Sequence, residues 1–288
     1  MKAGSQDDMN REEYHNRQAE SSGSKIPKAE SPKNEPYLER TYRESFQASD
    51  LTFFRILSEQ TDLYVGVGDK ASDEPVSAAA MKMAEGLARR VMMECRNRLE
   101  THIRQTPDFL VSLEPMKMPG GCHPMLAGMY RASASAGVGP MAAVAGAVAE
   151  WVGRELAARF SEVLVENGGD LWMAGTRRRT VGLFCGTSPL NGKLGLALSG
   201  REFPMGLCTS SGTIGHSLSF GKADAATVKA KDAFLADAVA TALGNRVKSV
   251  DDIQSALDWG ARIKGVTGLL VVVGDRMGAW GDMELALL

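Results

Sequence analysis

The chain has 288 residues, 44% of them hydrophobic, so it can bury a large core. A formal net charge of −2 and a sequence pI near 6.1 argue against the broad basic surface that nucleic-acid binding requires. Its longest apolar runs, such as Leu269 to Val273, are too short to span a bilayer, and its polar N-terminus does not resemble a signal peptide. Four scattered cysteines without a C-x-x-C pair favour a reducing compartment. We therefore expect a cytoplasmic globular protein with no nucleic acid and no membrane as partner.

The domain organisation follows from a change in composition near residue 36. Residues 1–36 are rich in Ser, Asn, Glu, Lys and Pro, with almost no large apolar side chain, which predicts a disordered tail. Residues 37–288 are expected to form a single domain. A loosely repeated order of strands and helices indicates that this domain consists of two structurally related halves.

In the first half, residues 51–57 and 62–67 read as paired strands and residues 76–103 as a long amphipathic helix. We expect a strand at 109–113, a loop at 115–124 and a helix that begins at Pro140. Gly139 and its neighbours precede that helix, and free N–H groups at a helix start can bind phosphate. The alternative is a helix of small residues packed against a sheet.

The second half starts with strands at 162–166 and 171–174, joined by the turn Asn167-Gly168-Gly169-Asp170. Further strands are expected at 180–185, 194–198, 205–208, 216–220, 226–229 and 267–273. Helices are expected from an N-cap at Asp232 to Gly244 and over 250–263, with a short amphipathic end at 283–288. Closely spaced strands between turns predict an α+β fold with antiparallel sheets and packed helices.

Residues 206–243 concentrate the groups that can carry chemistry. The segment Thr209-Ser210-Ser211-Gly212 offers three hydroxyls and a glycine, and His216 follows it. On the next helix, Asp237 and Thr241 are four residues apart and share one face, surrounded by alanines. A buried carboxylate is costly unless it is hydrogen-bonded or bound to a cation. Two interpretations stay open: a magnesium-type oxygen site, and an Asp–Thr pair that is satisfied internally.

These motifs resemble those of the FAD:protein FMN transferases, the ApbE family. Residues 226–228 and 235–243 are similar to its strand and its Ala-Asp-Ala-x-Ala-Thr-Ala helix, and Gly168-Gly169-Asp170 resembles its Asn-x-Gly-Gly-Asp hairpin. Thr209 to Gly212 resembles its Thr-Ser-Gly turn with one extra Ser. Residues 40–288 as a whole look closer to an uncharacterised ApbE-like family of bacteria and archaea.

The resemblance implies an ApbE-like fold of duplicated T-fold-like halves that binds FAD or FMN with Mg²⁺ and attaches FMN to a threonine of a target protein. By position, Asp237 and Thr241 would be the metal ligands, and His216 would be the catalytic residue. The stretches 168–170 and 209–212, with Gly139, would line the site of the flavin or of another pyrophosphate-bearing, nucleotide-like ligand.

The sequence also departs from the transferase pattern. Ser217-Leu218-Ser219 follows His216, where the family has Ile-Ile-Asp-Pro, Glu166 replaces an Asn, and the segment from Gly139 to Ala143 has no lysine. Two other functions therefore stay open. In one, a Cys208 thiolate carries out sulfur or acyl transfer, against the plainer interpretation of a buried strand cysteine. In the other, the protein is a non-catalytic ligand-binding or scaffold protein whose small-residue helices form a homo-oligomer interface.

Overall fold

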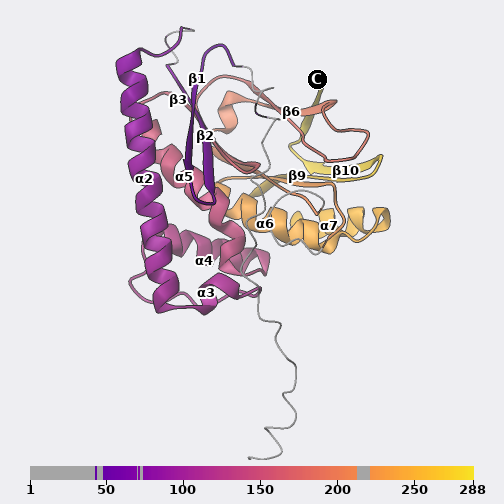
Figure 1. Ribbon diagram of the computed structural model, residues 1–288. Helices are drawn as coiled ribbons and strands as arrows, with labels where there is room; N and C mark the ends of the chain where they lie inside the picture. The colour runs from indigo at the N-terminus through magenta and orange to yellow at the C-terminus, as the bar shows by residue number, and fades with distance from the viewer. Residues whose placement is uncertain (1–42, 44–47, 70, 72–73, 213–220) are drawn as a thin grey trace, which may run out of the picture. The chain divides into compact units, whose positions relative to one another are not determined.

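The structure is a computed structural model that describes residues 43, 48–69, 71, 74–212 and 221–288 (Figure 1). His216 and the expected strand at 216–220 lie outside the described residues. Within the compact unit Phe46–Leu288, the described strands form an eight-stranded sheet in the order β1-β2-β3-β4-β7-β8-β9-β10 and a three-stranded sheet in the order β11-β6-β5. Each pair of neighbours is antiparallel, which confirms the predicted α+β class.

The strands of both sheets lie close to the predicted positions, with one omission at the C-terminal end. They are β1 (Thr52–Ser58), β2 (Thr61–Gly68), β3 (Glu162–Asn167), β4 (Asp170–Ala174), β5 (Arg179–Gly182), β6 (Leu194–Leu198), β7 (Met205–Ser210), β8 (Ala225–Ala230), β9 (Val266–Val273), β10 (Arg276–Gly281) and β11 (Glu284–Leu287). Strand β10 was not predicted, and the amphipathic end at 283–288 is the short strand β11. Both pair with strands that were predicted, β9 and β6.

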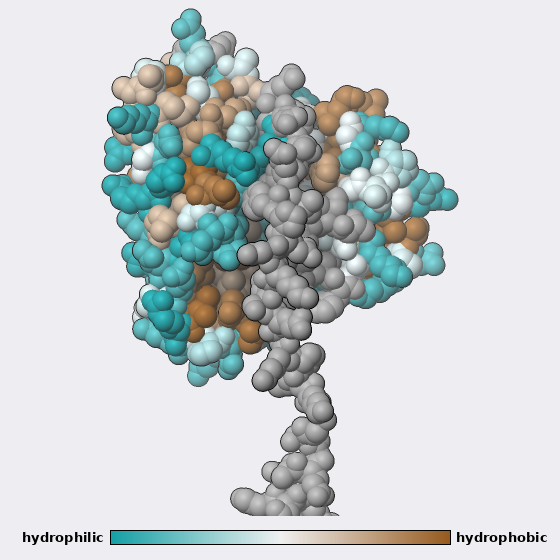
Figure 2. Space-filling model, viewed as in Figure 1, coloured by the Kyte–Doolittle hydropathy of each residue, from teal (hydrophilic) through white to brown (hydrophobic). Residues whose placement is uncertain are grey.

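The helices are α2 (Ala78–Gln105), α3 (Asp108–Val111), α4 (Pro124–Ala136), α5 (Val144–Ala157), α6 (Ala233–Arg246) and α7 (Ile253–Gly260). Short 3₁₀ turns cover Pro140–Ala143, Gly200–Glu202 and Val250–Asp252. Two strands, then helices, then two strands occur twice along the chain, around α2 to α5 and around α6 and α7. Figure 2 shows many hydrophilic residues on the side of the view where α2 lies, as expected for an amphipathic helix.

Two apolar cores lie on the two faces of the large sheet. Val163 and Val165 of β3 belong to the core that the helices cover, whereas Leu164 belongs to the core shared with the three-stranded sheet. Because successive side chains of a strand point to opposite faces, a strand buried on both faces needs an unbroken apolar run. This explains β9, in which Leu269 and Val271 face the helices, and Leu270 and Val272 face the small sheet.

One prediction for residues 109–136 was wrong, and one helix in this range was not predicted. The expected strand at 109–113 is the short helix α3, whose Phe109 is fully buried against the rings of His102 and Tyr130. Helix α4 was not predicted, although its boundaries carry recognisable signals. Nδ1 of His123 accepts a hydrogen bond from the Met125 N–H at the start of α4, and Gly137 ends the helix with φ of 71°.

Helix composition also bears on membrane insertion. Among the described residues, no single helix is long and apolar enough to cross a membrane. Pro124–Ala136 and Pro140–Ala157 have the length and composition of a membrane span only when they are taken together, and the two segments are bent by 108° relative to each other.

Candidate functional site

Helices α5 and α6 each supply a carboxylate that caps the first turn of the other helix. Asp237 of α6 accepts a hydrogen bond through Oδ2 from the Gly146 N–H of α5, at 2.8 Å. In return, Glu150 of α5 accepts one through Oε2 from the Ala233 N–H, the first residue of α6, at 2.5 Å. The first N–H groups of a helix have no partner within the helix, and a negative charge is favourable there. Each helix thus stabilises the N-terminus of the other.

Glycines allow α5 and β7 to approach the start of α6 closely. A Cβ at Gly146 would lie 2.2 Å from the Ala233 carbonyl oxygen and 2.8 Å from the Asp237 Cβ. On the other side of Ala233, a Cβ at Gly206 of β7 would lie 2.4 Å from the Ala233 Cα. The start of α6 is therefore held between α5 and β7. Most of the small residues of α5 and α6 are buried inside this chain.

Burial makes both carboxylates unusually weak acids. Desolvation raises the pKa of Glu150 to about 7, because it outweighs the Ala233 N–H and the ion pair with Arg154. Desolvation likewise raises the pKa of Asp237 to about 7, against the lowering effect of the N–H groups of Gly146 and Ala145. Near neutral pH each carboxyl group thus carries only a fraction of a charge, and a bound cation would favour the ionised form.

The Gly168-Gly169 hairpin lies beside this helix pair. Asn167 and Asp170 face each other across β3 and β4, and both glycines have positive φ, 71° and 100°, as a two-residue type I′ turn requires. The Asn167 side chain donates to the Ala145 carbonyl at 3.1 Å, which ties the hairpin to the start of α5. A Cβ at Gly169 would lie 3.6 Å from the Thr209 carbonyl oxygen, so the turn also borders the end of β7.

The hydroxyl-rich segment differs from the prediction in one respect. Thr209 and Ser210 are the last residues of strand β7 and not part of a turn, because both continue the ladder with β8. The Thr209 and Thr227 hydroxyls share a hydrogen bond of 2.9 Å. The Ser210 hydroxyl lies 3.6 Å from where a Cβ of Gly244 in α6 would be, and the Gly212 N–H donates to the Ala223 carbonyl.

Thr241 is half-buried and lies one helical turn beyond Asp237. Asp237 accepts from backbone N–H groups at the start of α5, so its carboxylate is satisfied within the chain by α5, and not by Thr241 as one interpretation expected. In the described ranges, no three His, Cys, Asp or Glu side chains lie close enough together to hold a metal ion. A cation at Asp237 would therefore take its other ligands from hydroxyls, carbonyls, water or a bound phosphate.

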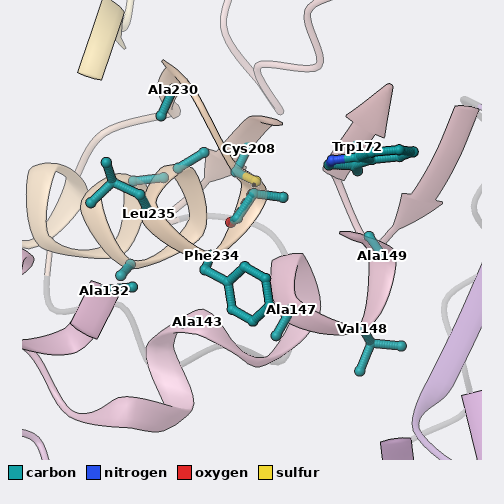
Figure 3. Close-up of a cluster of buried hydrophobic side chains, with 14 of the residues drawn as sticks. Ala132, Ala143, Ala147, Val148, Ala149, Trp172, Cys208, Ala230, Phe234 and Leu235 are labelled. Atoms are coloured by element: carbon teal, nitrogen blue, oxygen red, sulfur yellow. Dashed lines mark hydrogen bonds between the residues drawn. The ribbon is translucent and has the colours of Figure 1, made fainter. Parts of the chain in front are cut away.

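Gly139 and Cys208 have structural roles, and for Cys208 a buried strand cysteine was one of the two interpretations from sequence. Gly139 is buried, and a Cβ there would lie 1.7 Å from the Ser112 carbonyl oxygen, so this glycine lets two backbone segments touch. Cys208 is buried beneath α6, with its Sγ 3.7 Å from the Ala233 carbonyl oxygen (Figure 3). Burial, followed by the charges of Asp170 and Asp237, raises the pKa of Cys208 well above its usual value. Such a thiol stays protonated, which argues against a nucleophilic role.

Glu150 and Gly146 were not predicted from the sequence, and Asn167 was predicted only as a turn residue. Glu150 carried a signal, because it is the only charged residue in the apolar run from Val144 to Val152. A lone carboxylate in such a setting needs a partner, here the start of α6. Neither the contact of Gly146 with Asp237 nor that of Asn167 with Ala145 carried a signal, because each joins segments that are apart in the sequence.

The comparison with solved structures gives the class of the fold. A mutant of the flavin transferase ApbE from Vibrio cholerae superimposes with a TM-score of 0.50 at 10% sequence identity, over 80% of this chain and 96% of that chain. At that identity the likeness concerns the fold alone. The fold is thus ApbE-like.

Sequence comparison identifies the family. The profile of the family described as "AbpE bacteria" matches residues 43–284, and the chain belongs to this family. A UPF0280 protein of Methanocella arvoryzae is 43% identical over 65% of this chain and 77% of its own length. A UPF0280 protein of Methanocaldococcus jannaschii is 37% identical over 80% of this chain and 90% of its own length.

Proposed function

We propose that this protein binds a flavin nucleotide, FAD or FMN, or another ligand with a pyrophosphate group, together with Mg²⁺, where α5, α6 and the Gly168-Gly169 hairpin meet. The observation that carries the proposal is the convergence of separate motifs. The Asp237 helix face, the hairpin and the end of β7 are far apart in sequence, yet they adjoin through Gly146, Asn167 and Thr209. An ApbE-like fold and membership of the family support the flavin as ligand.

The groups around Asp237 fit a magnesium ion. Mg²⁺ prefers hard oxygen ligands, and it commonly binds one or two carboxylates together with water and substrate phosphates. Asp237 supplies one carboxylate, the Thr241 hydroxyl is the second ligand we propose, and few other protein ligands are needed. When bound, Mg²⁺ would neutralise charge on the pyrophosphate. The raised pKa of Asp237 is consistent with a carboxylate placed for a cation.

The remaining residues would position the ligand. The Ser210 and Ser211 hydroxyls are proposed to donate to phosphate oxygens, and the exposed Gly168 leaves room for a ligand beside the turn. Asp170 follows that turn and is buried beside Cys208, where it would orient rather than contact the flavin. His216, outside the described residues, remains our proposed catalytic residue.

The proposed reaction is transfer of FMN to a target protein. The hydroxyl oxygen of a threonine on the target forms a bond to the FMN phosphorus of FAD, the pyrophosphate P–O bond breaks, and AMP leaves while the hydroxyl proton passes to a base. We place this activity in the cytoplasm, because the four cysteines are unpaired and such thiols persist in a reducing compartment.

A comparison of related ligands tests the proposal. FAD, FMN and riboflavin are titrated with Mg²⁺ present, and binding is followed by flavin fluorescence anisotropy. If the site holds the pyrophosphate, FAD binds more tightly than FMN, and riboflavin binds weakest. Equal affinity for the three ligands, or no binding of any of them, would contradict the proposal. AMP released from FAD, measured by chromatography, then reports on transfer.

A further inference from the structure

A cavity of about 470 Å³ opens between α4, α5 and the start of α6. Its walls come from segments that are far apart in the sequence. Arg131 belongs to α4, Arg154 to α5, Lys231 precedes α6, and Lys264 follows α7. The cavity is lined by none of the residues that we propose for the flavin site. Helix α6 contributes only Phe234 and Leu235 to its walls.

The charges around this cavity are unbalanced. Four cationic side chains line it, whereas Asp232 is the one carboxylate among its described lining residues. Arg154 is paired with the buried Glu150, and Lys231 lies 4.0 Å from Asp232. No ion pair joins Arg131 or Lys264 to a carboxylate in the part of the chain that the structure describes. Cations that converge on a concave surface raise the local concentration of an anion.

The floor of the cavity is apolar. Phe234 is almost completely buried, and Trp151 beside it is half-buried, with its ring 5.3 Å from that of His123. Gly128 of α4 makes room for Phe234, since a Cβ at that position would lie 2.8 Å from the phenyl ring. The cavity thus combines a cationic rim with an aromatic floor, which suits a ligand with an anionic end and an apolar end.

The N-terminus of α6 also borders this cavity, but it is not the anion-binding group. The Leu235 N–H donates to Oδ1 of Asp232 at 2.8 Å, and the Ala233 N–H donates to Glu150. These N–H groups are already occupied by carboxylates of the chain. Binding of an anion would therefore depend on the side chains of the rim.

We propose that this cavity is a separate binding site for a small organic phosphate that carries an aromatic or other apolar group. The phosphate lies between Arg131 and Lys264, and the apolar group lies against Trp151 and Phe234. Arg131 and Lys264 are both exposed, so replacing them leaves the core intact and weakens only the hold on the phosphate. This site is independent of Mg²⁺ and of Asp237.

Phenyl phosphate and inorganic phosphate are suitable probes, titrated by calorimetry in the presence of EDTA while the indole NMR signal of Trp151 is followed. We expect phenyl phosphate to bind more tightly than inorganic phosphate and to shift that signal. Arg131→Gln and Lys264→Gln should each weaken binding about tenfold, the loss typical of one charge-assisted hydrogen bond. Arg262→Gln, which replaces an exposed cation outside the cavity, should leave the affinity for phenyl phosphate unchanged.

Three results would overturn the proposal: an unshifted Trp151 signal, equal affinity in the Arg131→Gln/Lys264→Gln double variant, or loss of phenyl phosphate binding in Asp237→Asn. The last result would mean that the probe occupies the proposed flavin site. Conversely, failure of FAD to bind leaves the outcome for phenyl phosphate unaffected, so the two proposals fail separately.

Discussion

Because Glu150 of α5 caps the first turn of α6 from a buried position, the substitution Glu150→Gln has a specific expected effect on stability. Glutamine has nearly the same shape, and its side-chain oxygen can still accept from the Ala233 N–H. It cannot ionise. The wild-type protein carries a fully buried carboxyl group whose pKa is raised from 4.5 to about 7, chiefly by desolvation. Between these two values the folded state holds a proton that the unfolded state has released.

The sign of the effect follows from this difference in proton binding. Stability falls with rising pH wherever the folded state binds more protons, here from about pH 4.5 to about pH 7. One pKa unit is about 1.4 kcal/mol, so the wild type should lose on the order of 3 kcal/mol relative to Glu150→Gln across that window. Above about pH 7 the difference between the two proteins should stay constant.

Urea denaturation at several pH values between 4 and 8 measures this difference directly. Glu155→Gln provides a matched control, because Glu155 lies on the same helix but is exposed. Its stability should run parallel to that of the wild type at every pH. If the curve for Glu150→Gln also ran parallel to that of the wild type, burial of an ionisable group at this position would be refuted.

Three further predictions concern packing, an ion pair and a thiol. Gly146→Ala should destabilise the protein by about 2 kcal/mol in urea, because its Cβ would meet the Ala233 carbonyl. Gly86→Ala, where a Cβ in α2 meets nothing within 4 Å, should stabilise the protein by roughly 0.5 to 1 kcal/mol. If the two substitutions changed stability equally, the close contact of Gly146 with Ala233 would be refuted. Arg179→Gln should cost about 3 kcal/mol at pH 7, because Arg179 pairs with the largely buried Asp50. Arg179 lowers the pKa of Asp50, so the loss should shrink below about pH 4 as that carboxyl is protonated, and a loss unchanged at low pH would contradict this. Cys208 should react with an alkylating reagent, detected by mass spectrometry, only as fast as the protein unfolds, and fast modification of the folded protein would reopen the thiolate hypothesis.

Much of the fold could be predicted from sequence because its signals are local. Runs of apolar and β-branched residues between turn residues predicted the strands. The side chain of Asp232 does accept from the Leu235 N–H at the start of α6, as an N-cap should. Helix α4 was missed because its Met, Ala, Gly and Ser residues form no clear polar face, and its buried residues mix Met125, Met129 and Tyr130 with small side chains. Strand β10 is exposed along most of its length, so no hydrophobic pattern marks it.

The candidate site was only partly predictable. Its motifs could be recognised from their order along the chain, but their contacts could not. Asp237 was expected beside Thr241 or a metal, and nothing local predicted that its carboxylate also caps α5 through Gly146, which is 91 residues away in the sequence. A contact of that kind depends on how α5 and α6 cross, and no local pattern encodes a crossing of two helices.

The central claim is that Asp237 belongs to a Mg²⁺-dependent flavin site, and one calorimetric measurement tests it most directly. FAD is titrated into the wild type and into Asp237→Asn, each with Mg²⁺ and with EDTA. Asparagine keeps the shape of the side chain and can still accept from Gly146, so the fold should be retained. We predict tight binding only for the wild type with Mg²⁺. Equal binding in all four titrations, or no binding in any, would contradict the assignment of Asp237.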